Sequence, residues 1–330
     1  MDFVLYFSLL IIGFVFLIKG ADFFVLSSSS MARKHNISPL IIGLTLVAFG
    51  TSLPELAVSF VASLTVQPGM TADIALGNVV GSNIVNITLI LGLTALVKSV
   101  PVSPTMHKRE FPYLILTTVV LVLFTYLFQI DYLIVWWEAL ILLILFIMYI
   151  YLMVTNKNQP LEESEIKIIN QKKAVILLIV GILGVSIGGF MVTKGAEFIA
   201  VKVLVNSFSM TLSKATTLVG LSVVAIGTSL PEMVTSIVAA KKGENEIAFG
   251  NIVGSNIFNS LFIIGLSGMF SPLGVNNDVA IDTLLLIPIT LFAVIFAISR
   301  HKVSRLEGVM LVCIYVIYLV YIILRALTIF

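Results

Sequence analysis

Long apolar runs make up most of the chain, and short stretches of polar, glycine and proline residues separate them. An apolar run of about 20 residues can cross a bilayer as a helix. Repeated runs of this length are typical of a polytopic helical membrane protein. Several runs exceed the length of a straight crossing, which indicates tilted or interrupted helices. The pattern predicts ten spans, over residues 3–31, 38–64, 72–97, 110–129, 132–154, 174–205, 214–240, 246–270, 278–299 and 304–328.

Two sequence blocks occur twice along the chain. GLTLVAFGTSLPE at 43–55 returns as GLSVVAIGTSLPE at 220–232. Downstream of each copy, GNVVGSNIVN at 77–86 returns as GNIVGSNIFN at 250–259. A chain that repeats both blocks in the same order is predicted to consist of two related halves.

The halves are predicted to be residues 1–154 and 174–330, joined by the polar loop 155–173. Each half contains five spans, and because five is odd, the second half enters the membrane from the opposite side. The predicted fold class is therefore all-α, with ten transmembrane helices in two inverted five-helix repeats. Transporters built this way hold their site near the bilayer midplane, on discontinuous helices.

The second and seventh spans are predicted to break in the middle. Gly50 and Pro54 interrupt the second span, and Gly227 and Pro231 interrupt the seventh. Proline lacks a backbone donor and clashes with the carbonyl four residues earlier, so it ends or kinks a helix. The break is expected to free backbone carbonyls near Ala48 and its counterpart Ala225. In the next span of each half, glycines at small-xxx-small spacing are expected to serve close helix packing; they are Gly77, Gly81, Gly250 and Gly254.

Composition supports the membrane interpretation and excludes other classes. Hydrophobic residues are 59% of the chain and charged residues 11%, and the net charge of +2 is small and scattered, which argues against nucleic-acid binding. The one cysteine, Cys313, excludes a disulfide within the chain. The N-terminal run has Asp2 in place of a basic segment and is too long for a cleaved signal, so it is expected to be a span. No cofactor is expected.

Basic residues predict the orientation, because loops on the cytoplasmic side carry an excess of Lys and Arg. With the N-terminus outside, most of the 19 basic residues fall in cytoplasmic loops. The expected location is a cell membrane, crossed many times, with the loop between helices five and six in the cytoplasm. Within the spans, Lys19 with Asp22 and Lys194 with Glu197 have i,i+3 spacing and are expected to form ion pairs.

Each copy of the first block places one carboxylate, Glu55 or Glu232, inside an apolar span. Such a residue is by default a functional-site candidate. If the four blocks converge, oxygen atoms of one site would come from Glu55, Glu232, Thr51, Thr228, Ser52, Ser229, Ser82, Ser255, Asn86, Asn259, Ala48 and Ala225. An oxygen-only set with two carboxylates suits hard cations such as Ca²⁺ and Na⁺, and argues against zinc or copper. Without a cation the carboxylates would repel each other, so protons are expected to compete.

The duplicated GTSLPE and GN-x-x-GSN sequences resemble the alpha-repeats of the Ca²⁺:cation antiporter superfamily, specifically its prokaryotic sodium/calcium exchanger branch. The resemblance covers essentially the whole chain in span count and repeat placement. It implies a ten-helix protein that exchanges Na⁺ for Ca²⁺ by alternating access, with the first and sixth spans sliding against the other helices. The protein is expected to act as a monomer in the lipid bilayer.

The resemblance also implies residue roles. Glu55 and Glu232 would be shared ligands of Ca²⁺ and Na⁺, and Thr51 and Thr228 would offer backbone carbonyls to Ca²⁺. One Na⁺ site would contain Ser52, Ser82 and Ala48, and the other Ser229, Ser255 and Ala225. Family members often carry an aspartate where this chain has Asn86 or Asn259, so the number of Na⁺ ions per Ca²⁺ stays open.

Three alternatives stay open at this point. The same fold could couple Ca²⁺ to H⁺ or K⁺; in the K⁺-dependent branch one motif glutamate is usually aspartate, and here both are glutamate. A passive cation channel is less favoured because inverted halves are typical of alternating access. An intramembrane hydrolase is disfavoured because the acids lie among potential ion ligands and no His-Glu-x-x-His sequence occurs. The chain is therefore expected not to be an enzyme.

Overall fold

The computed structural model describes residues 2–66, 71–127, 132–155, 168–208 and 210–326. Within these residues, eight helices are long and apolar enough to cross a membrane, and two further helix pairs each form a bent span. Ten spans are thus present, and the all-α membrane fold is confirmed. Most of the predicted loop 155–173 lies outside the described residues. The sixth long helix begins at Gln171, three residues before the predicted start at 174.

The first five spans contain the following elements: α1 Asp2–Lys34; α2 Pro39–Ile42, η1 Gly43–Val47, α3 Ala48–Thr51 and α4 Leu53–Thr65; α5 Asp73–Val85, η2 Asn86–Ile90 and α6 Leu91–Val97; β1 Val100–Pro101; α7 Pro104–Lys108 and α8 Glu110–Tyr126; β2 Leu133–Ile134; and α9 Trp136–Thr155.

The second five contain the following elements: α10 Gln171–Phe208; α11 Leu212–Val219, η3 Gly220–Val224, α12 Ala225–Thr228 and α13 Leu230–Lys241; α14 Asn245–Ile257, η4 Phe258–Ile263 and α15 Ile264–Phe270; β3 Leu273–Gly274; α16 Asn277–Ser299; β4 Lys302–Val303; and α17 Arg305–Ala326. The element order of the first half thus returns in the second, except that α7 has no counterpart.

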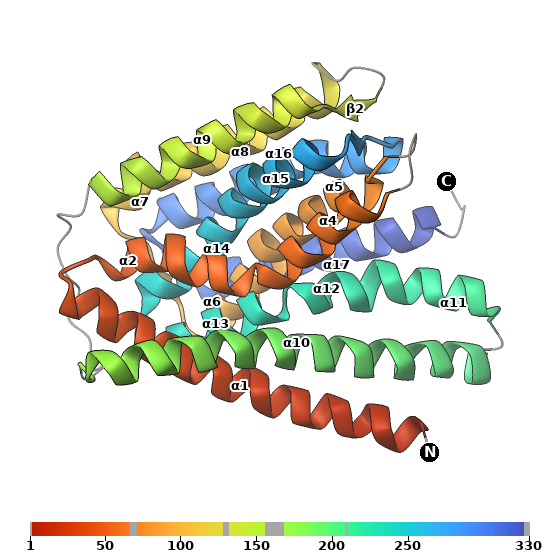
Figure 1. Ribbon diagram of the computed structural model, residues 1–330, viewed down its shortest axis with the longest axis horizontal. Helices are drawn as coiled ribbons and strands as arrows, with labels where there is room; N and C mark the ends of the chain where they lie inside the picture. The colour runs from red at the N-terminus through yellow and green to blue at the C-terminus, as the bar shows by residue number, and fades with distance from the viewer. Residues whose placement is uncertain (1, 67–70, 128–131, 156–167, 209, 327–330) are drawn as a thin grey trace.

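The two longest helices, α1 and α10, lie side by side along one edge of the bundle (Figure 1). Glycines allow this close approach: a Cβ added to Gly20 or Gly184 would meet the backbone of the other helix within 3 Å. Helices α8 and α9 lie along the opposite edge. Between these edges lies α14, in which Glu246 to Ile257 are all buried. The centre of the fold is therefore formed by a helix that carries one of the duplicated blocks.

Both broken spans bend where the sequence predicts. Ser52 leaves the helical conformation with φ −83° and ψ 11°, and Ser229 does so with φ −89° and ψ 8°. The helices before and after the break differ in direction by 51° in the first half and 55° in the second. The proline lies in the first turn of the following helix, where its missing N–H has no helical partner to lose. The prediction of two breaks is confirmed.

Each of the four spans that carry a duplicated block contains a π-helical turn. These turns are η1 and η3 in the broken spans, and η2 and η4 in the spans that follow them. A π-turn widens the helix locally and is frequent at functional sites. The sequence did not predict these turns, because no residue type marks them in the way that proline marks a break.

Two short antiparallel ladders also lie outside the sequence predictions. β1 pairs with β4, and β2 pairs with β3, two residues each. Each ladder joins a loop of the first half to a loop of the second. The ladders therefore fix the ends of α8 and α16 to one another without changing the fold class.

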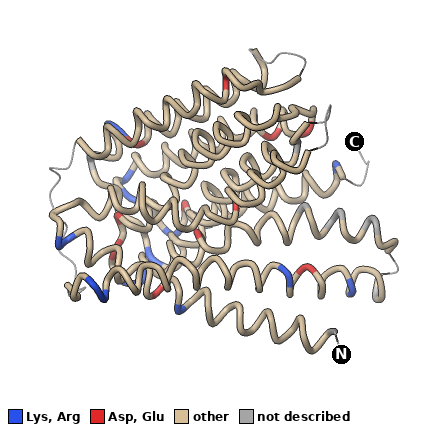
Figure 2. Tube along the Cα trace, in the orientation of Figure 1, with Lys and Arg blue, Asp and Glu red and all other residues tan. Residues whose placement is uncertain are grey.

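Basic residues concentrate at one end of the bundle. Figure 2 shows most Lys and Arg residues at the end opposite the two chain termini. The expected pair Lys194–Glu197 is confirmed, with 2.8 Å between Nζ and Oε2. The expected pair of Lys19 with Asp22 is wrong, because Asp22 instead pairs with Lys242 at the end of α13, at 3.0 Å. This contact joins the α1 edge to the second broken span.

Candidate ion-binding site

Two carboxylates, Glu55 and Glu232, lie in the first turns of α4 and α13, directly after the breaks. Both side chains are fully buried. The positive end of a helix dipole stabilises a negative charge at this position. No Lys or Arg of the described chain forms an ion pair with either residue. Their charge is therefore not neutralised by the protein's own cations.

The two breaks exchange hydrogen bonds. The Ser52 hydroxyl donates to Oε1 of Glu232 at 2.8 Å, and the Ser229 hydroxyl donates to Oε1 of Glu55 at 3.1 Å. In each half the sequence Ser-x-x-Glu matches a local capping box, in which serine and glutamate would cap the same helix. In the structure each serine instead donates its hydrogen bond to the carboxylate of the other half. This crossing brings Glu55 and Glu232 to one place.

The remaining carboxylate oxygens point to a missing partner. Oε2 of Glu55 and Oε2 of Glu232 are buried and have no hydrogen-bond partner among the described residues. Two buried charges with unsatisfied oxygens are costly unless something positive joins them. The two carboxylates also interact electrostatically with each other. The arrangement can therefore hold one or more cations between the halves.

Ser82 of α5 and Ser255 of α14 complete the polar surroundings. Ser82 lies beside Glu55, and Ser255 lies beside Glu232. The Ser52 and Ser255 hydroxyls are 3.0 Å apart. Ser52 thus contacts the other half's Ser255 because the two breaks meet at the centre. The expected grouping of Ser52 with Ser82 in one ion site stays a prediction.

The residues before each break differ between the halves. Thr51 is buried and its hydroxyl lies 3.0 Å from Oδ1 of Asn251, whereas Thr228 is half-buried and contacts the Ala225 carbonyl at 3.3 Å. The Ala48 carbonyl still accepts the Ser52 amide at 3.0 Å, so this break does not free it.

In the second half the corresponding amide, of Ser229, turns to Ile226 instead, at 3.1 Å. The Ala225 carbonyl therefore accepts only the long bond from Thr228 among the contacts found around this break. The Ala48 carbonyl also lies 3.3 Å from the Thr51 hydroxyl, so two donors contact it. A carbonyl has two lone pairs, so the Ala225 carbonyl retains an acceptor position for an ion.

Two asparagines, Asn78 and Asn251, were missed as site residues. The Asn78 amide donates to the main-chain carbonyl of Glu55 at 3.3 Å and to the serine four residues after that glutamate at 3.0 Å. Asn251 makes the same two bonds, with the same lengths, around Glu232. Each asparagine therefore fixes the turn that carries a carboxylate. The signal was present, because both stand at the second position of the duplicated GN-x-x-GSN block.

We expect Asn251→Ala to destabilise the protein by about 1–3 kcal/mol, because it leaves the buried Glu232 carbonyl and the Ser236 hydroxyl without their donor. Thermal unfolding of the purified protein in detergent measures this. The matched control is Asn245→Ala at the start of the same helix, where Oδ1 has no partner among the described residues. Equal loss in both variants would show that Asn251 has no special role in holding the turn.

Asn86 and Asn259 lie deeper along the two central spans and behave differently. Neither amide atom of Asn86 has a partner among the described residues, and the residue is fully buried. Asn259 donates to Oδ1 of Asn83 at 3.2 Å, and Asn83 donates to Ser260 at 2.8 Å. Oδ1 of Asn259 has no partner among the described residues either. The amide oxygens of both asparagines are thus available to a cation, whereas the amide nitrogen of Asn259 is already used.

An open cavity leads from the protein surface to one side of the site. Its volume is about 530 Å³, and Asn78, Ala225 and Thr228 line its inner part. Gly81 and Gly220 line it as well, and a Cβ added to either would meet nothing within 4 Å.

On the other side of the site the equivalent glycines are closely packed. A Cβ on Gly254 would lie 2.5 Å from the Leu44 carbonyl oxygen, and one on Gly43 would lie 2.9 Å from the Ile247 carbonyl oxygen. The packing prediction is confirmed for Gly250 and Gly254 and wrong for Gly81, because α11 and η3 stand away from α5 while η1 packs on α14. Gly77 makes only an ordinary contact, with 3.5 Å from an added Cβ to Val279 of α16.

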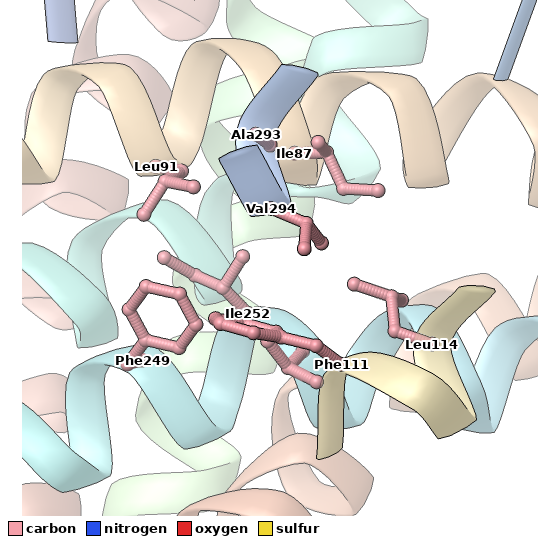
Figure 3. Close-up of a pocket in the computed structure, with 9 residues that line it drawn as sticks. Ile87, Leu91, Phe111, Leu114, Phe249, Ile252, Ala293 and Val294 are labelled. Atoms are coloured by element: carbon pink, nitrogen blue, oxygen red, sulfur yellow. The ribbon is translucent and has the colours of Figure 1, made fainter. Parts of the chain in front are cut away.

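Two other features do not form a site. One is a small void of about 10 Å³. The side chains that Figure 3 labels around it, such as Phe111 and Ile252, carry only carbon. A cation would lose its hydration there and gain no ligand. The sequence also contains GVSIG at 184–188, which matches the Gly-x-Ser-x-Gly pattern of hydrolases. These residues lie in the interior of α10, not at the strand-to-helix turn that exposes a nucleophile.

Comparisons with known proteins agree with this arrangement. The family described as sodium/calcium exchanger protein matches residues 5–155 and 173–324. Sodium/calcium exchanger MaX1 of Methanosarcina acetivorans is 34% identical over 355 residues, covering 95% of this chain and 97% of that protein. Inner membrane protein YrbG of Escherichia coli is 37% identical over 271 residues, covering 80% of each.

A solved structure of the sodium-calcium exchanger NCX_Mj, soaked without Na⁺ and Ca²⁺, superposes with a TM-score of 0.79 at 30% identity. It covers 97% of this chain, and this chain covers 99% of it. The ten spans, the two carboxylates bonded to serines of the opposite half, and these matches lead to one conclusion: the chain belongs to the sodium/calcium exchanger family.

Proposed function

We propose that the protein exchanges Na⁺ for Ca²⁺ across a cell membrane, with Glu55 and Glu232 as ligands shared by both ions. The observation that carries this proposal is the crossed pair of bonds from Ser52 to Glu232 and from Ser229 to Glu55. It joins two buried carboxylates from opposite halves without a basic partner among the described residues. The names of MaX1 and NCX_Mj support the same pair of ions.

Charge explains how one site serves two ions. Two carboxylates balance one Ca²⁺ or two Na⁺, so either load is stable and the two loads exclude each other. Oxygen ligands would also come from the Ser82 and Ser255 hydroxyls, the Asn86 and Asn259 amides, and the carbonyls of Ala48, Thr51, Ala225 and Thr228. All are hard donors, as both ions prefer. The chain holds no resident cofactor in this proposal; the ions are its cargo.

Alternating access is supported by the asymmetry of the two halves. η1 packs on α14, with Thr51 bonded to Asn251, while the equivalent η3 stands off α5. Two inverted halves that share one design can exchange these arrangements. In the opposite state η3 would close on α5, Thr228 would bond Asn78, and η1 would open. The site would then face the other side of the membrane.

The contacts of α1 and α10 support a sliding motion. Gly50 faces Phe24 of α1, whereas its counterpart Gly227 faces Thr193 of α10. The sequences from Lys19 to Asp22 and from Lys194 to Glu197 align α1 with α10. In this alignment Phe24 and Thr193 are six positions apart. If the two halves exchange these contacts, α1 and α10 must shift along their axes by about 9 Å, which is six residues at the rise of an α-helix. The glycines between α1 and α10 keep these two helices together as a unit that slides.

Orientation and organisation complete the proposal. The halves are residues 1–154 and 174–330, with 155–173 as a cytoplasmic linker and the N-terminus outside. The gathering of Lys and Arg at the end away from the termini supports this orientation (Figure 2). One chain supplies both carboxylates and both serines, which supports a functional monomer.

Ion flux in membrane vesicles tests the exchange. We expect Ca²⁺ uptake to follow an outward Na⁺ gradient and to cease when that gradient collapses, because both ions use the same carboxylates. The same vesicles are then given a pH gradient or a K⁺ gradient without Na⁺. Ca²⁺ movement that ignores Na⁺ and follows H⁺ or K⁺ would replace the proposed coupling ion, and unitary currents in single-channel recording would replace exchange by passive flow.

A further inference from the structure

The cavity that reaches Thr228 has a charged outer end. Asp278 and Asp282 lie in the first turns of α16, and Arg325 lies in the last turn of α17. All three line the cavity and are its only charged residues among the described ones. Figure 2 shows acidic residues at the start of α16 and a basic residue at the end of α17, at the end of the bundle where both termini lie.

Arg325 holds both aspartates. Its guanidinium forms two bonds of 2.9 Å with the two carboxylate oxygens of Asp282, and its Nε lies 3.5 Å from Asp278. It also lies over the Tyr321 ring, 5.2 Å from the ring centre. The side chains of Arg325 and Asp282 are 17% and 12% exposed, whereas that of Asp278 is 61% exposed. The triad thus carries a net charge of −1 at the cavity mouth.

A cation that moves through this cavity meets this triad before it meets Thr228 and Asn78. The aspartates attract it, but a guanidinium already occupies the position beside Asp282. Charges that line a cleft with low-dielectric walls change the local ion concentration strongly. An arriving Na⁺ or Ca²⁺ therefore competes with Arg325 for the same carboxylates.

We propose that Arg325 is a tethered cation that limits access of Na⁺ and Ca²⁺ to the site from the face where the chain termini lie. This inference rests on the proposed function, because it concerns the path of the same ions. Arg325 does not touch the site and acts through Asp278 and Asp282 at the cavity mouth. Its effect is on the affinity seen from one face and not on the exchange step.

Side-specific Ca²⁺ transport tests this role. Vesicles are prepared in both orientations, and protease access to a C-terminal tag identifies the face. For Arg325→Gln we expect the Ca²⁺ concentration of half-maximal transport at the terminal face to fall about three- to tenfold at low ionic strength. The effect should fade towards 1 M ionic strength, where the Debye length is about 3 Å. The value at the opposite face should stay unchanged.

Three further variants separate charge from structure. Arg325→Lys keeps the charge and should resemble the wild type. Asp282→Asn makes the triad neutral and should raise the half-maximal concentration about three- to tenfold, and the double variant Asp282→Asn with Arg325→Gln, again at net −1, should return close to the wild type. The control is Lys194→Gln, which breaks an ion pair that does not line the cavity.

The outcomes are distinguishable. A half-maximal concentration that is unchanged in Arg325→Gln, or changed equally at both faces, would overturn the access role while Na⁺-driven exchange stands. A loss of maximal rate in Arg325→Gln and Arg325→Lys alike, with a lower melting temperature, would assign Arg325 to holding α16 and α17 together and would also overturn it. If wild-type vesicles show no Na⁺-driven Ca²⁺ flux, the proposed function itself fails.

Discussion

Glu55→Gln and Glu232→Gln should each abolish Ca²⁺ transport. Either change leaves one negative charge for a divalent cation in a fully buried site. Leaving a buried charge without its counter-charge costs about 3–5 kcal/mol, and each 1.4 kcal/mol is a factor of about 10 in affinity. We therefore expect Ca²⁺ binding to weaken at least about 100-fold, measured by titration of the purified protein, and Na⁺-driven Ca²⁺ flux to disappear.

The control for this loss is Glu307→Gln. Glu307 is a buried glutamate as well, but it accepts the Ser304 amide at the start of α17, a capping role that glutamine also fulfils. This variant should transport at close to the wild-type rate. Near-normal Ca²⁺ flux in either site variant would remove Glu55 and Glu232 from the ligand set and leave the proposed function without its central observation.

Alanine at the two equivalent glycines should give opposite effects on stability. A Cβ on Gly254 would lie 2.5 Å from the Leu44 carbonyl oxygen, which is backbone and cannot turn aside. Gly254→Ala should therefore separate α14 from η1 and cost about 1–3 kcal/mol, seen as a lower melting temperature. Gly81→Ala meets nothing within 4 Å, and alanine is the better helix former by about 1 kcal/mol, so this variant should be as stable as the wild type or more stable.

Transport by Gly81→Ala then tests alternating access. In the opposite state Gly81 would take the crowded position that Gly254 has here, so its alanine variant should favour the present state. A bias of 1.4 kcal/mol would slow the exchange cycle about tenfold, with the protein well folded. A stable Gly81→Ala that transports at the wild-type rate would show that α5 and η3 never close on each other.

Much of this arrangement was predictable because it depends on proline and glutamate, which are unusual inside an apolar membrane helix. Proline at 54 and 231 predicted the two bends, and glutamate in an apolar run predicted the two buried carboxylates beside them. Repetition of whole blocks predicted the inverted halves. Each signal is local or is a direct comparison of one part of the sequence with another, so no knowledge of packing was needed.

Other features depend on which side chains of one half contact the other half. The sequence does not indicate these contacts. Ser52 lies next to its own half's glutamate in sequence, yet it bonds Glu232, because the two bends cross at the centre. Gly81 and Gly254 have the same sequence context but differ in packing, as the proposed alternation between two states requires. The π-turns occur in both the packed and the open broken span and have no residue signature of their own.

The crossed serines have a consequence for how the chain can be divided. A polypeptide that ends in the loop 155–173 would own a carboxylate but lack the hydroxyl that orients it, and its partner fragment would have the same defect in reverse. Neither fragment could bind Ca²⁺ alone at the affinity of the whole. Mixed together in one bilayer, the two fragments should regain the site, since the two serine–carboxylate bonds at its centre run from one fragment to the other.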